Sequence, residues 1–119
     1  MRIILTTETA MAAVVLKNQI LAAVKGDING LDIDTWTYVK SGDKFDIIFH
    51  NPDQYVDAPE KNVIFKVEVA GNEVAFSTAW WKGKPEPSRE MLSLHTGRLT
   101  EMLLRYFSGG YIRYSIVDF

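Results

Sequence analysis

The fold of this chain is decided by the stretch Asn62-Val-Ile-Phe-Lys-Val-Glu-Val-Ala70, Gly71-Asn72, Glu73-Val-Ala-Phe-Ser-Thr-Ala-Trp80-Trp81. Apolar and polar residues alternate in both arms, and glycine adopts the positive φ that a tight hairpin turn requires. The stretch therefore predicts a β-hairpin in which Ala70 lies opposite Glu73. Its apolar face carries the pairs Val69–Val74, Val67–Phe76, Phe65–Thr78 and Val63–Trp80. Its mixed face carries Glu68–Ala75, Lys66–Ser77, Ile64–Ala79 and Asn62–Trp81.

A second hairpin is predicted from strands at Ile33–Lys40 and Phe45–His50, joined by the loop Ser41–Lys44. One face carries the pairs Trp36–Phe49, Tyr38–Ile47 and Lys40–Phe45, and the reverse face carries Thr35–His50, Thr37–Ile48 and Val39–Asp46. Two hairpins with one bulky face each are typical of a single antiparallel sheet that is covered on one side. We therefore expect the following residues to be buried on the covered side of the sheet: Trp36, Tyr38, Phe49, Phe65, Val67, Phe76 and Trp80.

Two helices are predicted outside the hairpins. Thr7 is the expected N-cap of the first helix, which runs to Lys25 before Gly26. Ser88 is the expected N-cap of the second helix, whose apolar stripe is Met91, Leu92, His95, Leu99, Met102, Leu103, Tyr106 and Phe107. Gly97 interrupts this helix at a cost of about 1 kcal/mol relative to alanine. We expect close approach of the helix to the sheet to compensate, with backbone access for a ligand as the alternative.

The predicted fold class is α+β, with one domain spanning residues 1–119. An antiparallel sheet of five to six strands carries two helices packed on one face, in the order β(short)-α-β-β-β-β-α-β. Met1–Leu5 either forms the short strand or starts the first helix, and Tyr111–Phe119 is expected to be the last strand.

The composition excludes several classes of partner. The net charge is −2, so no general attraction to nucleic acid or to an anionic membrane is expected. Cysteine is absent, which excludes disulfides and thiolate metal sites.

Polar residues at 6–9 interrupt the apolar N-terminal segment, which argues against a signal peptide. We expect a cytoplasmic, bacterial or phage-like protein.

No residue is predicted to be catalytic, to bind a cofactor or to ligate a metal. His50 and His95 are the two histidines, and His95 falls on the apolar stripe, where a hydrogen-bonded core histidine is the usual finding. The acids Asp53, Asp57 and Glu60 lie in the long polar segment after His50, which is typical of a solvated loop.

The most informative functional feature is the pair Trp80-Trp81. Consecutive residues of a strand point to opposite faces, so Trp81 is predicted to lie on the mixed, uncovered face. The alternative is that residues 53–61 or a second copy cover it. The residues predicted to bind a partner are Ile48, His50, Ile64, Lys66, Trp81, Asp53, Asp57 and Glu60.

The sequence thus favours a non-enzymatic protein-binding module, such as a small inhibitor, an immunity-type protein or an adaptor that masks a partner protein with an exposed sheet face. One alternative is a small enzyme that uses His50 with loop carboxylates. Another is a homodimeric or larger homo-oligomeric structural or phage-assembly component, which buries the same face against itself.

Overall fold

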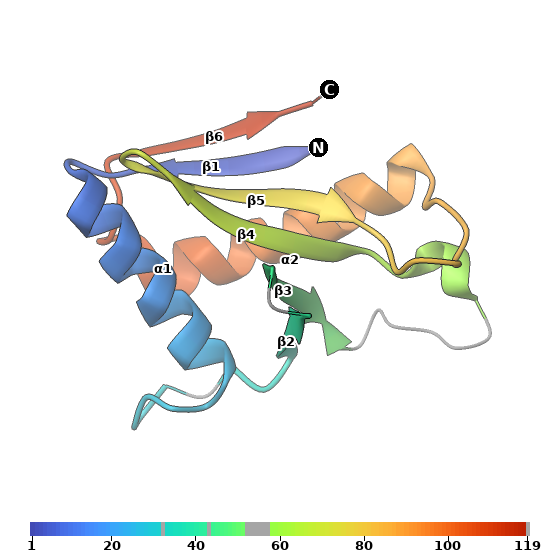
Figure 1. Ribbon diagram of the computed structural model, residues 1–119, viewed down its shortest axis with the longest axis horizontal. Helices are drawn as coiled ribbons and strands as arrows, with labels where there is room; N and C mark the ends of the chain where they lie inside the picture. Colours follow the sequence, from blue (N-terminus) through green and yellow to red (C-terminus); the bar gives the residue numbers. More distant parts are fainter. Residues whose placement is uncertain (32, 43, 52–57, 119) are drawn as a thin grey trace.

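The chain folds into one six-stranded sheet and two helices, counted over the residues that the computed structural model describes: 1–31, 33–42, 44–51 and 58–118. The elements are β1 (Arg2–Thr6), α1 (Ala10–Val24), β2 (Trp36–Ser41), β3 (Phe45–His50), the 3-10 turn η2 (Pro59–Lys61), β4 (Ile64–Ala70), β5 (Glu73–Ala79), α2 (Arg89–Phe107) and β6 (Arg113–Val117). The predicted α+β class and element order are confirmed (Figure 1).

The strands lie in the order β2-β3-β4-β5-β1-β6, and every neighbouring pair is antiparallel. For the N-terminal segment the sequence allowed either a helix start or a short strand. In the structure this segment is the strand β1, which lies between β5 and β6. Its start is held by Thr78, whose backbone N–H donates to the carbonyl of Met1 at 3.0 Å. The first and last strands therefore run side by side, with β6 at the edge of the sheet (Figure 1).

The register of the β4–β5 hairpin is confirmed. Ala70 lies opposite Glu73, Val67 opposite Phe76 and Ile64 opposite Ala79. The ladder begins at Ile64 and ends at Ala79, so the expected pairs Val63–Trp80 and Asn62–Trp81 are not part of it. Strand alternation consequently does not decide where the two tryptophans point.

The predicted register of the β2–β3 hairpin is wrong by one residue. Ser41, rather than Lys40, lies opposite Phe45, and Trp36 lies opposite His50. The turn is shorter than expected because the Lys44 N–H donates to the Ser41 carbonyl at 3.2 Å, with Gly42 at a φ of +57°. A shift of one residue exchanges the faces of all β3 side chains relative to β2.

The shift places Asp46 on the helix-covered face, where α1 supplies a counter-charge. Lys17 Nζ lies 2.7 Å from the Asp46 carboxylate, and the Tyr38 hydroxyl donates to the same carboxylate at 2.5 Å. Burial is the largest single influence and raises the pKa of Asp46, but the two hydrogen bonds together with the charges of Lys17 and Lys40 outweigh it and hold the pKa below its usual value. The polar contacts make a carboxylate acceptable at this position.

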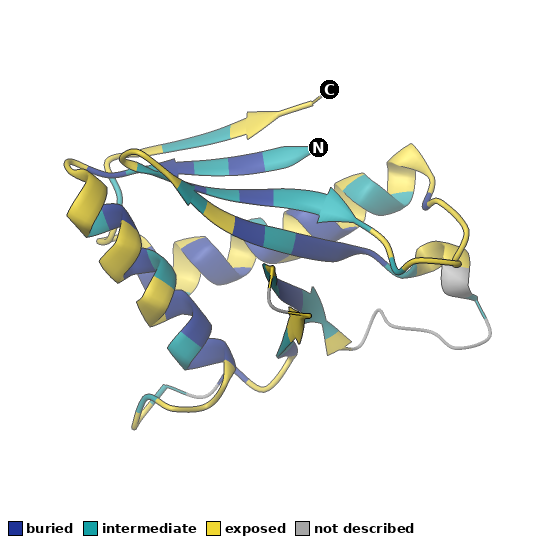
Figure 2. Cartoon of the chain, viewed as in Figure 1, coloured by how far each residue is buried: buried dark blue, intermediate teal, exposed yellow. Residues whose placement is uncertain are grey.

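Both helices pack on one face of the sheet, as predicted (Figure 2). The buried side chains of that face include Ile3, Leu5, Trp36, Ile48, Phe65, Val67, Val74 and Phe76. They meet Leu16 and Ile20 of α1 and Leu99 and Leu103 of α2. Burial is thus confirmed for Trp36, Phe65, Val67 and Phe76, and Tyr38 is partly buried. The prediction of burial is wrong for Trp80, which is 39% exposed. It is also wrong for Phe49, which the register shift moves to the other face.

The start of α1 differs from the prediction. Thr9, not Thr7, is the N-cap, and its hydroxyl accepts from the Ala12 N–H at 3.0 Å. Thr7 instead donates its hydroxyl to the carbonyl of Asn72 at 2.8 Å, which ties β1 to the turn between β4 and β5. Neither α1 nor α2, the helices of the described residues, combines the length and apolar character needed to span a membrane.

The predicted cap and stripe of α2 are confirmed, but the explanation for Gly97 is not. Ser88 accepts from the Met91 N–H at 3.2 Å, and His95 and Leu99 are buried. Gly97 lies on the exposed side of the helix, and nothing lies within 4 Å of where its Cβ would be. Close approach to the sheet therefore does not account for this glycine.

Candidate functional site

The residues predicted to bind a partner do not share one surface. Ile48 is fully buried in the core, and His50 lies on the helix-covered side, because the β2–β3 register differs from the prediction. Ile64, Lys66 and Trp81 remain on the other side of the sheet. Glu60 is exposed in η2. Asp53 and Asp57 lie outside the described residues.

The uncovered face carries a small aromatic cluster. The rings of Phe49 and Trp81 meet edge to face with centroids 5.9 Å apart, and Lys66 Nζ lies 4.5 Å from the centre of the Phe45 ring. Ile64 is only 2% exposed, so it offers almost no area of this face to a partner. Trp81 is half-buried and Trp80 is the more exposed of the pair, the reverse of the expectation.

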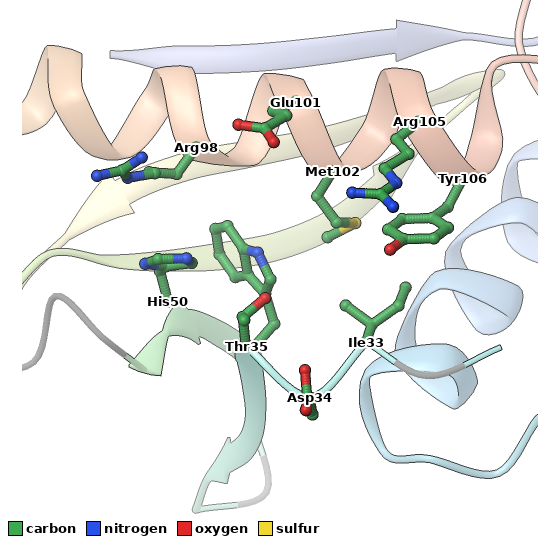
Figure 3. Close-up of a pocket in the computed structure, with 10 residues that line it drawn as sticks. Ile33, Asp34, Thr35, His50, Arg98, Glu101, Met102, Arg105 and Tyr106 are labelled. Atoms are coloured by element: carbon green, nitrogen blue, oxygen red, sulfur yellow. The ribbon is translucent and has the colours of Figure 1, made fainter.

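A cleft of about 320 Å³ lies on the helix-covered side, between α2 and the neighbouring ends of β2 and β3 (Figure 3). The lining residues are Ile33, Asp34, Thr35, Trp36, His50, Arg98, Glu101, Met102, Arg105 and Tyr106. Its volume is at the lower end of the range for ligand pockets, about 300–1,000 Å³. It has room for one or two side chains of a partner.

The floor of the cleft is aromatic and buried. Trp36 is buried. Its ring packs edge-on against His50 with centroids 5.4 Å apart, and it packs in a tilted arrangement against Phe65 with centroids 6.1 Å apart. Ile33 and Met102 are also buried beside it. The pairing of Trp36 with His50 brings the histidine here, so the shorter β2–β3 turn creates this part of the cleft.

The charged wall of the cleft belongs to α2. Arg98, Glu101 and Arg105 are spaced three and four residues apart, which places them on one side of the helix. Arg98 lies on the His50 side of the cleft and Arg105 on the Tyr106 side (Figure 3). The Arg105 guanidinium carbon is 5.2 Å from the centre of the Tyr106 ring. Two guanidinium groups thus flank an apolar floor.

The opposite lip, Asp34 and Thr35, is fixed by Asn51. The Asn51 backbone N–H donates to the Thr35 carbonyl at 2.7 Å, and its side-chain amide donates to the Asp34 carbonyl at 3.1 Å. The Thr37 hydroxyl also donates to the Asn51 side chain. These bonds keep the lip in place without a ligand.

The arrangement suits recognition of an anionic group. Guanidinium groups bind carboxylates through paired, charge-assisted hydrogen bonds, and the aromatic floor accepts the apolar part of a side chain. In the described part of the chain, no three His, Asp or Glu side chains gather as metal ligands. The α2 residues were not among the predicted site residues. The spacing of Arg98, Glu101 and Arg105 was a visible signal, but their position over Trp36 depends on tertiary packing.

Searches of protein-family models, of curated proteins and of solved structures found no match to this chain, so its site is interpreted from its own geometry.

Proposed function

We propose that this chain is a non-enzymatic protein-binding module of the inhibitor, immunity or adaptor kind, and that it holds its partner at the cleft between α2 and the β2–β3 hairpin. The observation that carries the proposal is the placement of Arg98 and Arg105 on either side of the buried Trp36 floor. This surface replaces the sheet face expected from the sequence, because Ile64 of that face is already buried and Ile48 lies on the opposite, helix-covered face.

The partner segment suited to the cleft carries an acidic side chain next to an apolar one. A carboxylate would bind a guanidinium of α2, and the apolar neighbour would lie on Trp36. Glu101 and Asp34 stand at the exposed rim and favour a basic residue beside the acidic one. A mixed sequence of this kind gives selectivity, because a uniformly acidic surface meets repulsion at the rim.

The experiment is a fluorescence-anisotropy titration with short labelled peptides that contain Asp or Glu beside Leu or Phe. Each peptide has a counterpart in which Asn or Gln replaces the acid. We expect the acidic peptides to bind, and the double variant Arg98→Gln/Arg105→Gln to weaken binding by about tenfold or more, which corresponds to about 1.4 kcal/mol. Arg113→Gln is the matched control, because Arg113 is exposed on β6 and does not line the cleft. Equal binding of acidic and amide peptides, or equal loss in the control, contradicts the proposal.

The enzyme alternative has one observation in its favour, since His50 and Glu101 line the same cleft. A general base must lie within hydrogen-bond reach of the proton that it takes. His50→Gln separates the two functions. We expect peptide binding to change less than about threefold, because the two arginines supply the main contacts. A catalysed reaction of the bound peptide that His50→Gln abolishes would favour the enzyme instead.

A further inference from the structure

The last strand, β6, forms one edge of the sheet and carries exposed apolar side chains. Among the residues that the structure describes it pairs with β1 alone, and exposed Ile112 (66%), Ile116 (51%) and Val117 (40%) lie in or next to the strand. A strand edge of this kind offers a row of backbone donors and acceptors to another strand. Proteins normally protect such edges with charges, prolines or bulges.

The two edges of the sheet differ in this protection. The β2 edge ends in exposed Lys40 and Ser41, and the Thr37 side chain is bonded to Asn51. The segment Arg113–Val117 has its single charged residue, Arg113, at the first position and contains no proline, and its pairing with β1 is regular over the whole strand. The β6 edge is therefore the one that can accept a further strand.

The hydrogen bonds of β1 show which backbone groups of β6 point outward. The bonds from Thr7 N–H to the Asn72 carbonyl and from Thr78 N–H to the Met1 carbonyl direct the odd-numbered residues of β1 toward β5. The even-numbered residues consequently bond to β6, and their partners there are Arg113, Ser115 and Val117. The N–H and C=O groups of Tyr114 and Ile116 therefore point to the free edge.

We propose that β6 pairs antiparallel with β6 of a second copy of this chain, with Tyr114 opposite the second copy's Ile116 and Ser115 opposite itself on the twofold axis. In this register the outward N–H and C=O groups of each Tyr114–Ile116 pair bond to one another. Moving the axis to Tyr114 would require the Ile112 N–H, which already donates to the Thr6 carbonyl at 2.8 Å. The six-stranded sheet then continues across the axis into the second copy.

The side chains favour a second copy as the occupant. Tyr114 and Ile116 lie on the helix-covered face, and an aromatic side chain opposite a β-branched one stabilises an antiparallel pair. A twofold axis perpendicular to the sheet applies this contact twice. Each copy then covers the exposed Ile116 of the other with Tyr114, so one strand supplies both halves of the contact.

The flank of α2 beside β6 supports the same arrangement. The Thr100 hydroxyl is bonded to the Tyr114 hydroxyl, and Arg89 forms an ion pair with Asp118, so α2 runs alongside β6. Gly97 and Leu104 share the Thr100 side of the helix at spacings of three and four residues. Both are exposed, and Gly97 has open space around it. The second copy's helix can approach here and cover Leu104.

A cysteine crosslink tests both the dimer and its register, because the chain has no cysteine of its own. Ser115→Cys should form an intermolecular disulfide under mild oxidation, since a non-hydrogen-bonded antiparallel pair has Cα atoms about 4.5 Å apart. Arg113→Cys alone should not, because its copies would be roughly 13 Å apart along the strands. A mixture of Arg113→Cys and Val117→Cys should crosslink as a heterodimer. Crosslinking of Ser115→Cys no faster than that of Arg113→Cys alone overturns the proposal.

Sedimentation velocity supplies the second test. We expect a dimer for the unmodified chain, and Ile116→Lys should weaken it by about tenfold or more, because the lysine is placed opposite Tyr114 in the pair. Met11→Lys is the matched control: Met11 is an exposed apolar residue on α1 and takes no part in the proposed contact, so its replacement should leave the dimer intact. A monomer in all forms, or equal loss in the control, overturns the proposal even if the cleft binds peptides as proposed.

Discussion

Asp46 shows how a single side chain can reveal which face of a strand is covered. On sequence alone a carboxylate is assigned to the exposed face, because burying an unpaired charge is costly. In the structure Asp46 faces α1 and accepts hydrogen bonds from Lys17 and Tyr38. The Asp46 carboxylate in turn raises the pKa of Tyr38 to about 12. This partly buried polar cluster identifies the correct β2–β3 register, and it depends on the position of α1.

Asp46→Asn should therefore destabilise the fold by about 1.5–3 kcal/mol at neutral pH, the value of a hydrogen bond to a charged group. The folded pKa of Asp46 is lower than its unfolded value of about 3.9, so its stabilisation is present above about pH 4. It is lost as pH falls through the folded pKa. Urea unfolding of both proteins across pH should show the difference between them shrinking in acid. A difference that stays constant down to pH values well below 4 contradicts this assignment.

The tryptophans and Phe76 make a second test at the residue scale. Phe76 is fully buried, so Phe76→Ala should cost about 3–5 kcal/mol. Trp80 is exposed beyond the end of β5, so Trp80→Ala should cost less than about 1 kcal/mol. Trp81→Ala should cost more than Trp80→Ala, because it removes the packing against Phe49. A lower melting temperature for Trp80→Ala than for Trp81→Ala would contradict this placement. It would favour the expectation from strand alternation, in which Trp80 is buried and Trp81 is exposed.

At the scale of single elements, the two hairpins show what turn chemistry can predict. Gly71-Asn72 allows a tight turn with one obvious register, and that register is observed. The loop Ser41–Lys44 allows turns that differ by one residue, and the alternation of β3 does not choose between them because Ile47 and Ile48 are both apolar. Both are in fact buried, one on each face of the sheet. The register thus depends on tertiary contacts such as Lys17–Asp46.

Gly97 offers a test of α2 by itself. It lies on the exposed side of the helix with open space around it, so Gly97→Ala should stabilise the fold by about 0.5–1 kcal/mol. Chemical denaturation in the Ile116→Lys background isolates the effect from association. Destabilisation by alanine in that background would mean that the glycine has a packing role within the single chain.

The N-terminus of α1 can be tested in the same way. Thr9 caps the helix, so Thr9→Ala should cost about 1 kcal/mol, and Thr9→Ser should recover most of that loss. The rescue distinguishes a cap from general packing. If Thr9→Ala is neutral in denaturation, the N-cap assignment fails and the sequence-based choice of Thr7 regains support.

At the scale of the whole molecule, the fold class, the element order and the covered face of β4–β5 follow from periodicity and turn residues. The insertion of β1 between β5 and β6 does not, because Met1–Leu5 is short and apolar in a way that suits either a strand or a helix. The cleft also could not be predicted. It needs Trp36 and His50 on one face and α2 directly across from them, and both conditions are set by packing between distant segments.

The cleft and the uncovered sheet face are rival surfaces for a partner, and the three tryptophans report on them separately. Trp36 lies in the floor of the cleft, whereas Trp81 lies with Phe49 on the uncovered face and Trp80 is exposed at the end of β5. The indole N–H signals of the ¹⁵N-labelled protein, assigned with single Trp→Phe variants, can be followed while an acidic peptide is added. We expect the Trp36 signal to shift in a saturable way while the Trp80 and Trp81 signals stay in place. A saturable shift of Trp81 with Trp36 unmoved would contradict binding at the cleft and return the partner to the open face of the sheet.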